Sequence, residues 1–104
     1  MQPVRFLVGD PELTRIWFAG IASPDALSEA DRHRFDLLLM AQIIEADANH
    51  ALFRQGALEP EVWAVWDRIL DSWLRHPRFQ HLWNSGFLPS FVTASLAGRV
   101  REKL

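Results

Sequence analysis

The chain of 104 residues contains no cysteine and no tyrosine. The absence of cysteine excludes disulfides, thiolate catalysis, cysteine-ligated zinc and iron–sulfur clusters. Five Trp and seven Phe supply the aromatic surface. Without phenol hydroxyls, that surface is mostly of the kind that is buried in a core. The length suits one domain, so we predict a single helical domain over residues 1–104.

The sequence also lacks an excess of either charge and any long apolar run. Eleven Lys and Arg stand against thirteen Asp and Glu, which gives a net charge of −2. No basic run is present, which argues against a nucleic-acid partner. No stretch approaches the ~20 apolar residues of a membrane span, and the first residues lack a signal-peptide pattern. We therefore expect a cytoplasmic protein with no membrane span and no nucleic-acid partner, or a membrane-associated one if a longer native chain was trimmed.

One long segment dominates what remains. Ser28 and Asp31 predict the start of a helix by their three-residue spacing, and Gly56 predicts its end. Between residues 35 and 44 this helix is apolar almost all the way round, which is typical of a helix surrounded by neighbours. We predict an all-α fold with four to five helices packed around a long central helix at about 28–55.

Proline and glycine divide the rest of the chain into helical segments, and no strand alternation is visible. Asp10-Pro11-Glu12 predicts a helix over 11–21, and Gly20 near its end would let another helix approach closely. The apolar run at 4–8 predicts a helical turn or the stub of a helix. Three further helices are predicted to begin at Pro60, Pro77 and Pro89.

Asp47 and His50 lie three residues apart and therefore share a helix face. In helical di-metal proteins a carboxylate and a His at this spacing are ligands, but the motif occurs twice and other helices add Glu. Here it occurs once. We interpret the two residues as a buried polar pair that fixes helix packing, and we predict no catalytic residue, no cofactor and no metal. A metal-dependent enzyme that uses Asp47 and His50 is the weakest of three functional hypotheses.

Four tryptophans between residues 63 and 83 are the other candidate site: Trp63, Trp66, Trp73 and Trp83. At helical spacing such a stripe is more often core. Its density still leaves room for one exposed indole edge, and Trp is a favoured anchor at protein interfaces. The first hypothesis is therefore a non-enzymatic protein-interaction or self-association module. The alternative is a binder of a small apolar ligand in a Trp/Phe-lined pocket between helices.

The chain resembles a family of small uncharacterised bacterial helical proteins, from about Phe6 to its end. The residues that carry the resemblance are Asp10-Pro11-Glu12-Leu13 with Trp17 and Gly20, Arg34-Phe35, Gly56-Ala57-Leu58 with Trp63, and Trp83 and Phe91. Members of the family often carry an N-terminal membrane segment, which is missing here, and a Glu where this chain has Asp47. The resemblance implies a helical domain and no particular activity.

Overall fold

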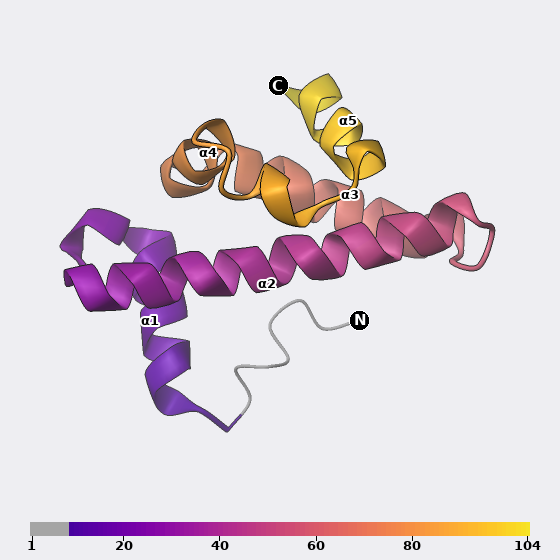
Figure 1. Cartoon of the computed structure of the whole chain (residues 1–104). Helices are drawn as coiled ribbons and strands as arrows, with labels where there is room; N and C mark the ends of the chain where they lie inside the picture. The colour runs from indigo at the N-terminus through magenta and orange to yellow at the C-terminus, as the bar shows by residue number, and fades with distance from the viewer. Residues whose placement is uncertain (1–8) are drawn as a thin grey trace. The chain divides into compact units, whose positions relative to one another are not determined.

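The computed structural model describes residues 9–104, which form five α-helices and two short 3-10 turns and contain no strand (Figure 1). The helices are α1 (Pro11–Ala22), α2 (Glu29–Arg54), α3 (Pro60–Leu74), α4 (Pro77–Asn84) and α5 (Ala94–Lys103). The turns are η2 (Pro24–Ala26) and η3 (Pro89–Phe91). The all-α prediction is confirmed, and the helical turn predicted at 4–8 lies outside the described residues.

The longest element, α2, is one helix of 26 residues. Its start has the predicted cap, because the Asp31 amide donates to Ser28 Oγ at 3.1 Å. At its end Gly56 has φ +77, a conformation that glycine adopts without strain. The Ala57 amide then donates to the Leu52 carbonyl at 2.8 Å, as in a Schellman motif. The observed helix lies within the predicted span and stops one residue short at each end.

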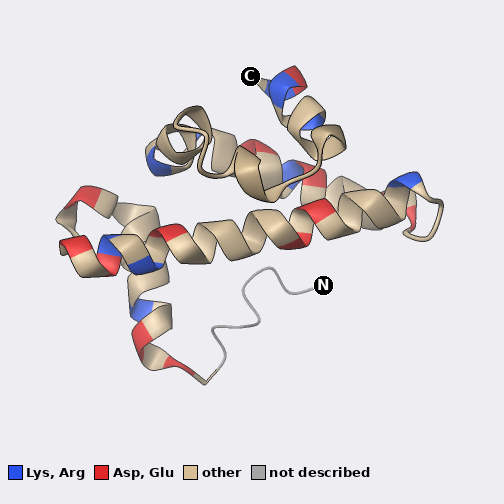
Figure 2. Cartoon of the chain, viewed as in Figure 1, with Lys and Arg blue, Asp and Glu red and all other residues tan. Residues whose placement is uncertain are grey.

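The middle of α2 buries one broad face and not its whole circumference. Residues 37–44 carry no charge (Figure 2). Leu38, Leu39 and Ile43 are buried, whereas Leu37 and Ile44 are about two-fifths exposed. These two residues lie seven apart and so share the opposite face. The expectation of a helix enclosed on every side is wrong for that face, because apolar side chains also make up much of a protein's surface.

The contacts divide the chain into two compact units, Met1–Gln42 and Ile43–Leu104. The helix α2 runs through both units, with Gln42 as the last residue of the first. The prediction of a single domain over 1–104 stays a prediction.

The first unit is held by a close crossing of α1 and α2. Gly20 faces the ring of Phe35, and a Cβ at this glycine would overlap that ring. The Trp17 ring packs against the same Phe35 at 5.7 Å between centroids. On the surface Arg15 donates to Asp31 at 2.9 Å. The close approach predicted at Gly20 is confirmed.

The second unit has an aromatic core. In α3 the buried face carries Trp63, Trp66 and Leu70, while Ile69 is only half-buried. Phe79 of α4 lies between two indoles, 5.9 Å from Trp73 and 6.3 Å from Trp83. The aromatic segments predicted to be helical thus provide most of the core of this unit.

The last helix begins later than predicted. Pro89 starts only the η3 turn, and Val92 after it is extended. Thr93 is the N-cap of α5, and its hydroxyl accepts from the Leu96 amide at 3.4 Å. The expectation of a helix from Pro89 is therefore wrong, since a cap residue four positions further on starts the helix instead.

Three ion pairs join α5 to α3, one of them between Lys103 Nζ and Asp67 Oδ1 at 3.1 Å. The Arg99 guanidinium donates to both carboxylate oxygens of Asp67, at 3.0 and 2.7 Å. Lys103 donates to Asp71 at 2.6 Å. The hydrogen bonds from Arg99 keep the pKa of Asp67 below its usual value, against a smaller opposing effect of burial. These contacts fix the rotation of α5 about its axis.

Candidate functional site

Polar residues gather where α2 meets the start of α5, within the second unit. Asp47, His50 and Arg54 come from α2, and Thr93 and Ser95 come from the α5 end. The α2 residues follow at intervals of three and four, so they share one face. This group, which we call the α5 anchor, contains both residues of the predicted polar pair.

Asp47 holds the residue that caps α5. Its Oδ1 accepts from the Thr93 amide at 3.0 Å and from the Thr93 hydroxyl at 2.8 Å. The same hydroxyl oxygen accepts from the Leu96 amide. Asp47 therefore positions the N-cap of another helix, which is a structural role. Both of these hydrogen bonds join Asp47 to Thr93 of the α5 end, and neither involves His50.

His50 is the buried member of the pair, with 7% of its surface exposed. Its ring packs on Trp63 at 4.7 Å between centroids, and its Nδ1 lies 3.4 Å from Ser95 Oγ. Burial lowers the pKa of this imidazole, and the neighbouring Arg54 charge adds to the effect. A neutral ring fits this position, because Nδ1 can then accept from the serine hydroxyl.

Arg54 completes the group by donating to Ser95 Oγ at 2.6 Å. A shallow hollow of about 370 Å³ lies here, lined by His50, Ala51, Arg54, Gln55, Thr93 and Ser95. The serine and the imidazole are close enough to suggest a nucleophile and a base. However, a catalytic imidazole needs a third group to orient it, and the Asp47 oxygen that is engaged contacts Thr93. The α5 anchor has the geometry of a packing contact more than that of a catalytic site.

The same residues lack the further ligands that a metal site needs. Within residues 9–104, no three His, Asp or Glu side chains are grouped so that they could hold a metal ion. Helical di-metal sites draw carboxylates from several helices. The geometry thus gives no support to the hypothesis of a metal-dependent enzyme at Asp47 and His50.

The tryptophans do not form the surface that the sequence suggested. Trp63, Trp66, Trp73 and Trp83 are all buried, with at most 7% of their surface exposed. Three of them pack on other rings: Trp63 on Phe53 at 5.9 Å between centroids, and Trp73 and Trp83 on Phe79. The expectation of an exposed indole edge is wrong, because the second unit uses its indoles to fill its own core.

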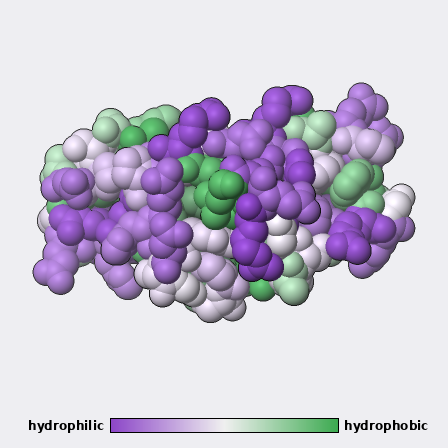
Figure 3. All heavy atoms as spheres, turned by 90° about the horizontal axis from the view of Figure 1, so that it is seen from above, coloured by the Kyte–Doolittle hydropathy of each residue, from purple (hydrophilic) through white to green (hydrophobic). Residues whose placement is uncertain are grey.

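Exposed phenylalanines take the place of the expected indoles. Phe18 on α1 is 62% exposed, and Ile21 one turn later is 40% exposed. Phe91 in η3 is 40% exposed and packs edge-on against Phe87 at 5.2 Å. Apolar side chains reach the surface between hydrophilic ones on the face drawn in Figure 3. Sequence reasoning missed Phe18, although its spacing from Glu12 and Arg15 places it on the charged side of α1.

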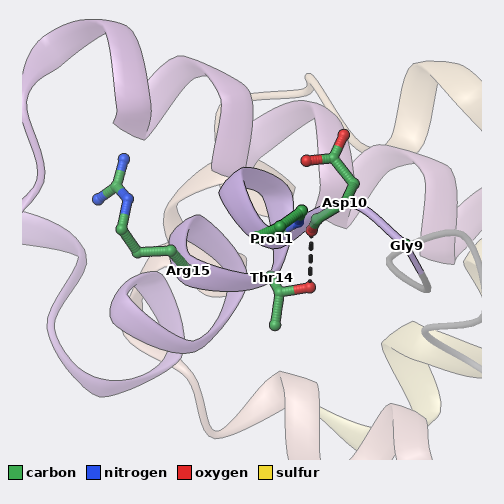
Figure 4. A pocket seen from close by; sticks show the side chains of 5 residues that line it. All are labelled: Gly9, Asp10, Pro11, Thr14 and Arg15. Carbon is green, nitrogen blue, oxygen red and sulfur yellow. Dashed lines mark hydrogen bonds between the residues drawn. The ribbon is translucent and has the colours of Figure 1, made fainter.

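A second hollow, of about 460 Å³, lies at the start of α1 (Figure 4). It is lined by Gly9, Asp10, Pro11, Thr14 and Arg15. Its polar groups serve the helix start: Asp10 accepts from the Leu13 amide at 3.1 Å, and Thr14 Oγ1 donates to the Asp10 carbonyl at 2.8 Å. Arg15 points away toward its acidic partners. This hollow is a helix cap and not a built binding site.

Comparison of the chain with protein-family models, curated proteins and solved structures found no match. The resemblance to a bacterial helical family stays a prediction. Among residues 9–104, no helix combines the length and the apolar character that crossing a membrane requires.

Proposed function

We propose that the protein is a non-enzymatic module that associates with a second copy of itself through Phe18 and Ile21, which we call the α1 patch. The observation that carries this proposal is the 62% exposure of Phe18. Aromatic side chains are enriched at protein interfaces, and an adjoining apolar residue widens the contact area. On the opposite face, Trp17 and Gly20 pack within the first unit, so α1 is positioned by one face and exposed on the other.

The charges near the α1 patch suit a second copy. Glu12 pairs with Arg15 on the same helix, and Asp31 pairs with both Arg15 and Arg34. Two acidic and two basic groups therefore leave the surface beside the patch close to neutral. The whole chain carries only −2, and a small net charge gives little repulsion between copies. In a two-fold dimer the same patch lies against itself, which brings two apolar surfaces together.

The small size of the α1 patch predicts weak self-association. A standard interface buries about 800 Å² on each partner, which is far more than two side chains provide. We therefore expect a weak dimer whose population rises with concentration. The alternative of an apolar ligand among the tryptophans has less support, because those side chains are buried, and Trp63 and Trp83 already pack on phenylalanine rings.

Light-scattering mass across a range of protein concentrations tests this proposal. We expect the parent mass to rise above the monomer value of 12.0 kDa as concentration increases. Phe18→Ser should keep the monomer mass throughout, because it removes the more exposed of the two side chains of the α1 patch. Phe91→Ser is the matched control, since Phe91 is an exposed phenylalanine of the second unit, and it should behave like the parent.

Two results would contradict the proposal. One is a parent that stays at the monomer mass at every concentration, which would leave a different protein as the partner. The other is an equal loss of the dimer in both phenylalanine variants, which would show that association is nonspecific and does not depend on the α1 patch. Thermal melts of each variant show whether it remains folded.

A further inference from the structure

The α5 anchor places a buried imidazole at the contact between two helices. His50 is packed on one side by Trp63 of α3 and faces Ser95 of α5 on the other. An imidazole is the one unperturbed side chain whose charge changes between pH 5 and 8. Its protonation state therefore bears directly on how α5 attaches to α2.

The hydrogen bonds around Ser95 favour a neutral ring. Arg54 donates to Ser95 Oγ at 2.6 Å, so the serine hydrogen is available to the His50 Nδ1 at 3.4 Å. If Nδ1 gains a proton, it becomes a donor and faces the same oxygen that already accepts from Arg54. Two cations would then converge on one hydroxyl group.

Charged groups on every neighbouring helix affect this balance. On α2, Arg54 opposes a charged imidazole and Asp47 favours it. Arg99 of α5 opposes the charge, and Asp67 of α3 favours it. Both carboxylates are already engaged, Asp67 by Arg99 and Asp47 by Thr93. Burial opposes the charged imidazole more than any of these groups does, and the ring face of Trp63 attracts a cation only weakly.

We infer that His50 is a pH-sensitive latch: its neutral ring holds the start of α5 against α2 and α3, and its protonation loosens that attachment. The device needs no ligand. It would vary the exposure of the α5 end, and of the hollow beside it, over a pH range found inside cells and their compartments. The inference is independent of the α1 patch, which lies in the other unit.

The direction of the effect follows from linkage. The pKa of His50 is lowered in the folded protein, so the unfolded chain binds this proton more readily. The contribution to stability is complete above the ordinary pKa of about 6.5. It is lost as pH falls from there through the folded pKa. Acid should therefore weaken the α5 attachment, and mildly alkaline conditions should leave it intact.

Hydrogen exchange at a series of pH values tests the latch, after correction for the intrinsic pH dependence of exchange. In the parent, we expect the amides of Leu96, Ala97 and Val100 to lose protection between pH 7.5 and 5 by a larger factor than the amides of α3. His50→Gln keeps an acceptor for Ser95 and cannot gain a proton, so it should remove this extra loss. His81→Gln is the control, because it removes an exposed imidazole of the same unit and should leave the loss unchanged.

An equal loss of protection in the parent and in His50→Gln would overturn the inference, and so would a parent whose α5 protection does not respond to pH. If His50→Gln does not fold, the parent alone decides. The imidazole protons of His50 and the amides of Ser95 and Leu96 should then shift in NMR spectra with one common midpoint. Amides of α5 that do not follow the imidazole would refute the latch.

Discussion

The two units of this chain hold their helices in different ways. In the first, α1 rests on α2 through one close crossing, where Gly20 lies against the Phe35 ring. In the second, α3 and α4 share a core of indole and phenyl rings, and hydrogen bonds from both ends of α5 tie that helix to α2 and α3. The close crossing buries one face of α1 and leaves the face that carries Phe18 exposed, whereas the second unit buries its tryptophans in its own core. The difference indicates why the α1 patch, and not the tryptophan cluster, faces solvent.

Truncation in the aromatic core should have the largest effect. Trp66 is fully buried, and Trp→Ala in a core costs about 3–5 kcal/mol. We expect Trp66→Ala to remove most of the stability of the second unit, as measured by chemical denaturation. Trp66→Phe should cost much less, because it keeps a ring and removes an indole N–H that has no partner among the described residues.

The same variant tests whether the units fold together. If residues 1–104 form one domain, as predicted, Trp66→Ala should also lower the hydrogen-exchange protection of α1, because α2 belongs to both units. Protection of α1 that survives the loss of protection in α3 would instead establish two independent domains.

Replacing glycine by alanine should change stability in opposite directions in the two units. Gly20→Ala places a Cβ into the Phe35 ring, and overpacking of this kind costs about 1–3 kcal/mol. Gly98→Ala in α5 meets nothing within 4 Å, so it should stabilise by about 0.5–1 kcal/mol through helix propensity. Thermal melts of the two variants check the contrast, and destabilisation of equal size in both would refute the account of the close crossing.

Substitutions of the residues that cap the helix starts should cost less stability than truncation in the core. Asp47→Ala removes two hydrogen bonds to Thr93, and Asp10→Ala removes one cap bond to the Leu13 amide. We expect the free energy of unfolding to fall by about 1–2 kcal/mol in Asp47→Ala and by about 1 kcal/mol in Asp10→Ala. Asp47→Asn keeps an acceptor oxygen and should recover part of the loss. Denaturation that finds no cost for Asp47→Ala would show that Thr93 caps α5 without help from α2.

Sequence reasoning located the helices because their ends carry strong local signals. Asp10, Ser28 and Gly56 act through their own backbone neighbours, so their roles can be predicted from residue type and spacing. The start of α5 was misplaced because Pro89 also suits a short turn. Thr93 caps the helix through the Leu96 amide, and it is held in place by Asp47, 46 positions earlier in the chain.

The candidate sites were harder to predict for the same reason. Helical spacing identified Asp47 and His50 as neighbours on one face, but their partners belong to another helix. The tryptophans were recognised as a cluster, yet whether an indole is covered depends on Phe53 and Phe79 from other segments. The exposure of Phe18 could have been found from its position among charged residues of α1.

Phe18→Ser should have the smallest effect on stability and the largest effect on self-association. Phe18 is mostly exposed, so Phe18→Ser should alter the free energy of unfolding by no more than about 0.5 kcal/mol. Its effect on self-association should be a loss. A variant that unfolds would show instead that Phe18 is part of a core.

Because the chain has no cysteine, a single introduced thiol can trap the proposed dimer. Ala22 is exposed one turn beyond Phe18, so a two-fold axis that passes through the α1 patch would bring its two copies close to each other. We expect Ala22→Cys to form a covalent dimer on mild oxidation. Phe18→Ser added to Ala22→Cys should abolish that dimer, and Ser90→Cys in the second unit should not form one. Equal trapping of Ala22→Cys with and without Phe18→Ser, or no trapping at all, would contradict self-association through the α1 patch.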